Sequence, residues 1–175
     1  LDVQQVAAWI EGGSAPEPAT VQAASFNPNR LDTLRSRTSA AYRGLYVLIQ
    51  REGACDFFWK ARMVDLDRDE VKLDIHHIFP KKWCEDKRIS PRVYDAIVNK
   101  TAISYKANRM IGGRAPSQYL NQLQTNPQVQ LPDAAMDTLL RSHAIDPGHL
   151  RADAFEAFYT ARKAALLAIV VRAMG

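Results

Sequence analysis

The sequence predicts a mainly α-helical domain that contains one small β-hairpin. Three observations favour this class: apolar residues recur at helical spacing on both sides of the middle of the chain, an alternating stretch with β-branched residues covers 71–79, and a second short strand pattern follows at 100–104. Hydrophobic residues make up 47% of the chain and charged residues 24%, which is the balance of a globular protein. We expect an N-terminal linker and helical extension over 1–30 and a single domain over 31–175.

The first part of the chain contains two helix patterns separated by turn residues. Residues 1–10 (LDVQQVAAWI) fit a short helix, and the glycines and prolines of 12–18 predict a loop. The run SAAYRGLYVLIQREG predicts a longer helix, for which Gly53 would serve as the C-cap. The alternation over 71–79 then predicts a strand that ends before Pro80.

The second strand pattern leads directly into further helices. KTAIS at 100–104 is followed by a helical pattern over 105–111. Pro116 fits the first position of another helix, and Asp133 can cap a third. Aromatic and aliphatic residues at helical spacing predict a last helix over about 152–174, which we expect to close the core.

Positive charge is concentrated between residues 81 and 114. The net charge of the whole chain is +4, and this segment holds nine Lys or Arg residues against three acidic ones. Six of its side chains are candidates for contacts with nucleic-acid phosphates: Lys81, Lys82, Lys100, Lys106, Arg109 and Arg114. A polyanion such as DNA would favour this placement, and a solvated basic face would give the same pattern.

Cysteine usage and the lengths of apolar runs exclude several classes of protein. Cys55 and Cys84 do not form a CxxC motif, which argues against a zinc ribbon or a disulfide framework and fits the reducing cytoplasm. The longest apolar run, 164–171, is too short to span a bilayer, and we find no signal-peptide pattern. The chain begins at Leu1 and not at Met, so we expect it to be a piece of a longer cytoplasmic protein.

The adjacent pair His76 and His77 ends the first strand pattern, within LDIHHIFPKKW. Adjacent residues at the end of a strand point in different directions, so one imidazole can ligate a metal while the next faces a water molecule. Hydrolysis of a phosphodiester with a single metal needs both a cation that holds the phosphate and a base that takes a proton from the attacking water. An imidazole suits the second task because its ordinary pKa is about 6.5.

Two asparagines supply the remaining parts of such a site. Asn99 lies at the start of the second strand pattern, where its amide can accept the other ring N–H of the base and fix its tautomer. Asn108 lies on the following helix, where it can provide a second metal ligand. Lys106 and Arg109 flank it and can hold phosphates. The hairpin and this helix together would form a compact metal site.

HHIFP, Asn99 and Asn108 match, in order, the three motif elements of the HNH nucleases, the ββα-metal or His-Me finger superfamily. The segments RTSAAYRGLYVLIQREGACDFFW, DIHHIFPKKWC and IVNKTAISYKANRMIGGRAPSQYL also resemble the C-terminal nuclease domain of GmrSD-type restriction proteins. This resemblance covers about residues 30–125 and implies a ββα-metal core over about 71–112, embedded in a helical domain. It further implies a bacterial anti-phage protein that acts on modified DNA and that carries an N-terminal nucleotide-hydrolysing domain.

The resemblance also implies a role for each site residue. His76 would be a metal ligand, His77 the general base, Asn99 the orienter of His77, and Asn108 the second metal ligand. Asparagine at this last position, where the superfamily often has histidine, gives an oxygen donor that suits Mg²⁺ or Mn²⁺ better than zinc. The implied activity is metal-dependent DNA nicking or cutting as the effector of a defence protein. The alternative is a module that grips DNA phosphates without cleaving.

Overall fold

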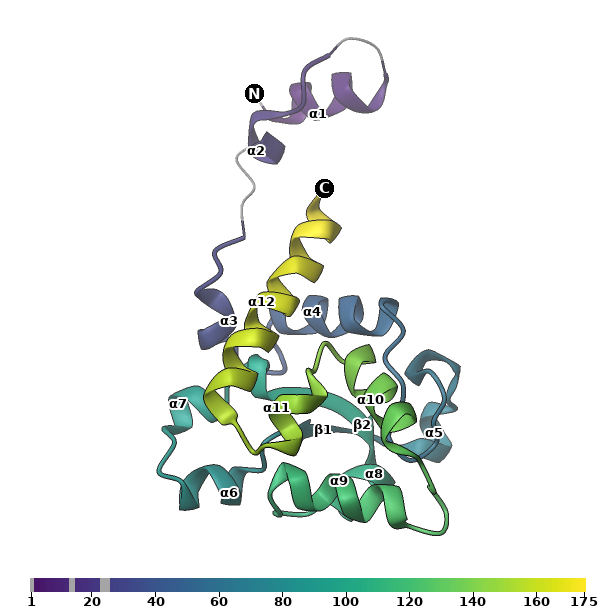
Figure 1. Ribbon diagram of the computed structural model, residues 1–175. Coiled ribbons are helices and arrows are strands. Elements are labelled where there is room, and N and C mark those ends of the chain that lie inside the picture. The colour runs from purple at the N-terminus through teal and green to yellow at the C-terminus, as the bar shows by residue number, and fades with distance from the viewer. Residues whose placement is uncertain (1, 13–14, 23–25) are drawn as a thin grey trace.

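The computed structural model describes residues 2–12, 15–22 and 26–175, and it is mainly helical with one two-stranded antiparallel sheet (Figure 1). Part of the predicted extension over 1–30, namely residues 1, 13–14 and 23–25, lies outside the described residues. The extension includes α1 (Asp2–Ile10) and α2 (Ala19–Gln22), which stand apart from the other helices in Figure 1. Within the described part of the chain, no helix has the length and apolar character needed to cross a membrane.

The sheet consists of β1 (Leu73–His77) and β2 (Lys100–Ser104), with His76 opposite Thr101 and His77 opposite Lys100. β2 occupies the predicted residues. β1 is shorter than the predicted 71–79, because Val71 ends the helical turn α5 (Arg68–Val71) and Lys72 has a positive φ of 47° that interrupts the strand. Helix α8 (Tyr105–Ile111) follows β2 without a linker and packs against both strands.

The connection between the two strands is itself built from short helices. It contains α6 (Lys81–Asp86), α7 (Pro91–Tyr94) and the 3₁₀ helix η2 (Ile97–Asn99). Ser90 caps α7 by accepting the N–H of Arg92, and Pro91 occupies the first turn, where its missing N–H costs nothing. The connection returns to the end of β1, where the N–H of Ile78 donates to the carbonyl oxygen of Asn99 over 2.9 Å.

The remaining elements form a helical frame around the hairpin: α3 (Arg30–Thr33), α4 (Ala40–Arg51), the 3₁₀ helix η1 (Met63–Asp65), α9 (Pro116–Thr125), α10 (Asp133–Ser142), α11 (Pro147–Arg151) and α12 (Phe155–Met174). Ser39 caps α4, and Gly53, just past its end, has the positive φ of 92° expected of a C-terminal glycine. α12 begins three residues later than predicted, because Ala152–Ala154 form a turn in which Asp153 has a φ of 51°.

Two clusters of buried apolar side chains form the core, and α12 contributes to both. Phe155 and Phe158, in its first turns, pack in the cluster that contains side chains of α8, α9 and α10. Leu166 and Val170, further along, pack in the cluster that contains side chains of α3 and α4. Tyr159 contacts both clusters. The last helix therefore packs across the core, as its apolar spacing predicts.

Arg162 lies on α12 between these two sets of turns and is only 1% exposed. Its guanidinium donates to backbone carbonyl oxygens of the η2–β2 segment and to that of His143. Burial lowers the pKa of Arg162 to about 9, which leaves it charged at neutral pH. This side chain thus ties α12 to the segment that leads into β2.

Candidate functional site

Asn108 on α8 links two side chains of β1 into one polar chain. Its Oδ1 lies 2.9 Å from Nδ1 of His76, and its Nδ2 donates to Oδ2 of Asp74 over 2.6 Å. Asp74 and His76 share a face of β1 because side chains alternate along a strand, and α8 packs against that strand. The Asp74 carboxylate can only accept hydrogen bonds, so it turns the amide oxygen of Asn108 toward His76.

The His76 ring is almost completely enclosed, at 3% exposure, and burial lowers its pKa to about 3. The imidazole is therefore neutral at physiological pH, as a metal-ligating histidine must be. Its Nε2 is buried without a hydrogen-bond partner, and its ring centroid lies 5.9 Å from that of Tyr119 at an interplanar angle of 84°. Because the amide oxygen of Asn108 can only accept a hydrogen bond, the neutral ring carries its proton on Nδ1, the nitrogen that faces Asn108.

His76 and Asn108 offer two donor atoms that could hold a divalent cation. In this structure the Nδ1–H of His76 donates to Asn108 Oδ1 over 2.9 Å; with the ring proton on Nε2 instead, this nitrogen and this amide oxygen would be donors of the kind that Mn²⁺ and Mg²⁺ accept. Among the described residues, no group of three or more histidine, cysteine, aspartate or glutamate side chains could hold a metal. The site predicted from the sequence therefore rests on His76 and Asn108, with the Asp74 carboxylate bonded to Asn108.

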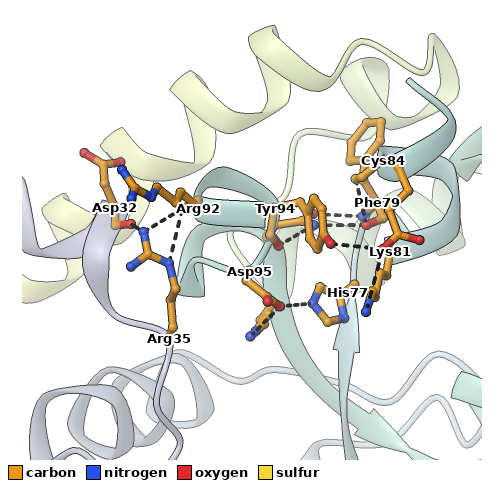
Figure 2. Close-up of polar contacts among 12 residues, drawn as sticks. Asp32, Arg35, His77, Phe79, Lys81, Cys84, Arg92, Tyr94 and Asp95 are labelled. Atoms are coloured by element: carbon orange, nitrogen blue, oxygen red, sulfur yellow. Dashed lines mark hydrogen bonds and ion pairs between the residues drawn. The ribbon is translucent and has the colours of Figure 1, made fainter. Parts of the chain in front are cut away.

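His77 faces a different partner from its neighbour. Its Nε2 lies 2.8 Å from Oδ1 of Asp95, which comes from the connection between the strands, and Figure 2 shows this carboxylate turned toward the ring. An ionised carboxylate accepts a hydrogen bond, so Nε2 carries the proton and Nδ1 keeps its lone pair. Partial burial lowers the pKa of His77, an effect that the Asp95 bond opposes. The imidazole is consequently neutral at pH 7 and can accept a proton at Nδ1.

Asp95 also pairs with Lys100, whose Nζ lies 3.2 Å from Oδ1. Burial opposes the ionisation of Asp95, but the bonds from His77 and Lys100 outweigh it and hold the pKa of Asp95 below its usual value. Lys100, predicted to contact nucleic-acid phosphates, is only 8% exposed, and its ammonium is paired with Asp95 in this structure. The alternation of β2 turns this ammonium to the His77 side of the hairpin, where it neutralises Asp95.

Asn99 does not contact His77 as predicted. Its amide is fully buried and bonds the backbone, accepting the N–H of Phe79 and donating to the carbonyl oxygens of Phe79 and Tyr94. These three bonds fix the chain just after β1 to the end of α7. The side chain that bonds the His77 ring is therefore Asp95, and Asn99 instead bonds the backbone of Phe79 and Tyr94, close to both residues in the chain.

The other five predicted phosphate-binding side chains lie on α6, on α8 and just after it, in different surroundings. Lys81 and Lys82 form surface pairs with Glu85 and Asp86, one helical turn away. The remaining three are exposed, and within the described part of the chain they have no carboxylate partner: Lys106, Arg109 and Arg114. Basic side chains on α8 are accordingly more available to an anion than those on α6.

Sequence reasoning missed Asp95 because its partners are distant along the chain and no spacing rule links them. One signal was present: Asp95 is one of only three acidic residues in the basic segment 81–114. An isolated carboxylate among cations often has a specific partner, and here it has two.

Comparison with known proteins gives one sequence relative. The chain is 29% identical over 126 residues to MJ0686, an uncharacterized protein of Methanocaldococcus jannaschii; the match covers 70% of this chain and 21% of that protein. The chain thus spans about a fifth of the length of the relative it matches. No protein-family model and no solved structure matches the chain.

Proposed function

We propose that this chain is a metal-dependent DNA endonuclease of the HNH type, with a ββα-metal core formed by β1, β2 and α8, acting as the effector domain of a restriction or anti-phage protein. One observation carries the proposal. Two adjacent histidines of one strand have separate partners: His76 faces an amide oxygen of Asn108, and His77 faces the carboxylate of Asp95. This separation of partners supports the assignment of one imidazole as a metal ligand and of the other as a base.

His77 would take the proton of the attacking water at Nδ1, while Asp95 holds Nε2–H and stabilises the imidazolium that forms. Lys100 keeps Asp95 ionised throughout. His76 and Asn108 would hold Mg²⁺ or Mn²⁺. When bound, such an ion supplies Lewis-acid stabilisation of charge on the phosphate and on the leaving oxygen. Asp74 keeps the amide oxygen of Asn108 on the His76 side.

Nicking of a supercoiled plasmid tests the proposal. The purified chain is assayed with Mg²⁺ or Mn²⁺ and with EDTA, and the wild type is compared with His77→Ala. We expect open-circle product that requires metal and that falls by about 100-fold or more in the variant, the usual contribution of a general base. His149→Ala is the matched control, because this partly exposed histidine on α11 lies outside the site.

Equal cleavage by the wild type and His77→Ala would refute the assignment of the base. A gel shift in EDTA completes the test. A wild type that shifts DNA but never nicks it with either metal would replace the nuclease with the non-cleaving binding module.

A further inference from the structure

An exposed aromatic and basic surface lies on α8 and on the turn that precedes η1. Trp59 is 45% exposed and Tyr105 is 47% exposed. Beside them lie two exposed cations, Lys106 and Arg109. We call these four residues the α8 aromatic face. The described residues include three large aromatic side chains with this degree of exposure, and two of them lie here; the third, Trp9, is on α1.

The cations of this face lie against aromatic rings. The Nζ of Lys106 is 4.0 Å from the ring centroid of Phe58 and 5.4 Å from that of Trp59. Arg109 donates to the Tyr105 hydroxyl over 3.0 Å, and its Cζ is 5.4 Å from the Tyr105 ring centroid. Cation–π contact holds each positive charge beside a partly exposed ring.

A buried carboxylate fixes the two parts of this face to each other. Asp56 is fully buried and accepts the N–H groups of Phe58 and Trp59 from the turn. It also accepts the N–H and hydroxyl of Ser104, the residue that caps α8. The turn that carries Trp59 is therefore anchored to the first turn of the helix that carries Tyr105. A pre-organised face of this kind loses little conformational entropy when a ligand binds.

The charge and the position of the face indicate its ligand. Neither Lys106 nor Arg109 has a carboxylate partner among the described residues, so the face carries uncompensated positive charge. Residues three and four apart share one side of a helix, so Tyr105, Asn108 and Arg109 lie together on α8. The face thus adjoins the candidate metal ligand. Cations beside exposed rings fit a ligand that offers phosphates and flat apolar surfaces, which is an unpaired nucleic-acid strand.

We propose that the α8 aromatic face binds single-stranded DNA, with unpaired bases stacked on Trp59 and Tyr105 and phosphates paired with Lys106 and Arg109. The proposal rests on the proposed function for the choice of DNA, and it narrows the substrate class to single strands and locally opened duplexes. In a duplex the bases stack on each other and their faces are not available to the rings. Phosphates held on this side of α8 would place the backbone of the strand beside His76 and Asn108.

Binding is measured without cleavage, in EDTA, with an oligothymidylate of about 15 nucleotides labelled with fluorescein. Fluorescence anisotropy gives the affinity of the wild type for this strand and for a duplex of equal length. We expect tighter binding of the single strand and an affinity about tenfold lower in Trp59→Ala and in Tyr105→Ala, the usual effect of losing one stacking ring. Trp59→Phe keeps a ring and should keep most of the affinity.

Trp9→Ala is the matched control, because Trp9 is 46% exposed but lies on α1, and its affinity should equal that of the wild type. Tryptophan emission gives an independent reading: the oligonucleotide should quench the wild type, and the quenching should be lost in Trp59→Phe. Equal affinity of Trp59→Ala and wild type, or a duplex bound as tightly as the single strand, would overturn the proposal. Because no cleavage is measured, either failure leaves the plasmid-nicking result standing.

Discussion

Replacing Asp95 by asparagine changes the hydrogen bonding of His77, the proposed base, while the side chain at position 95 keeps almost the same shape. The carboxylate oxygen that contacts His77 Nε2 over 2.8 Å also contacts Lys100 Nζ over 3.2 Å. In Asp95→Asn a single amide oxygen must serve both donors. If the amide turns its NH₂ group to the ring, the proton of His77 moves to Nδ1, the nitrogen that must accept the proton of water. The substitution therefore disturbs the tautomer of His77 without removing the imidazole.

The magnitude follows from these contacts. Losing a group that orients a functional histidine costs about 10- to 100-fold in activity. The Asp95 bond raises the pKa of His77, so its loss lowers this pKa further below its usual value. Activity rises with pH as His77 loses its proton, and the rising limb of the profile should move to lower pH.

The substitution also affects stability. Lys100 loses its counter-charge, which should lower the free energy of unfolding by about 1–2 kcal/mol. This is less than the about 3–5 kcal/mol for breaking a buried pair, because the Asp95 side chain is 42% exposed and screened.

The assay is the initial rate of plasmid nicking from about pH 5 to pH 8, the range in which histidine titrates. Asp86→Asn is the control, because it makes the same change in an exposed pair with Lys82 and should leave rate and profile unchanged. A variant as fast as the wild type, or a rising limb that moves to higher pH, would refute the role of Asp95.

Three further predictions concern stability. Asn99→Ala removes the amide partner of three buried backbone groups of Phe79 and Tyr94, and should lower the free energy of unfolding in urea by about 2–4 kcal/mol. Arg162→Met removes the donors to buried carbonyl oxygens of the η2–β2 segment, and the same measurement should show a loss of about 2–4 kcal/mol. Acid should destabilise the fold, because burial lowers the pKa of His143 from 6.5 to about 4, so the unfolded chain takes up a proton first. Its contribution is present above pH 6.5 and is lost as the pH falls toward 4; the melting temperature of the wild type should fall over this range, and less steeply in His143→Gln.

Sequence patterns correctly predicted the elements whose position depends on residues close together in the chain. β2 and α8 lie where the sequence placed them, because the short β-branched run KTAIS and the capping Ser104 are local signals. The start of α12 was predicted less accurately. Asp153 adopts the left-handed region, and the alanine-rich sequence around it gives no local signal for this turn. The juxtaposition of His76 with Asn108 follows from pairing two strands and adding a helix, so it too could be expected.

The polar partners of His77, the proposed base, could not be predicted in the same way. Asn99 and Asp95 are both near the end of β1 in space, and either could be proposed as the orienter of His77. The choice depends on burial: Asn99 is fully enclosed, where its amide must satisfy backbone groups, whereas the Asp95 side chain stays 42% exposed beside Lys100. Burial depends on the whole helical frame, which the spacing of two residues does not specify.

The register of the hairpin is what gives the two histidines different chemistry. Side chains alternate across a strand, so His76 is turned to the Asn108 side, where enclosure lowers its pKa to about 3 and keeps it neutral. His77 is turned to Lys100 and Asp95, where it stays partly exposed and can reach water. A slip of one residue would exchange these surroundings, placing the proposed base in the closed pocket and the proposed ligand at the surface. The bonds that Asn99 makes to the backbone just after β1 oppose such a slip, so we expect a residue without a hydrogen bond to either imidazole to help hold both in place.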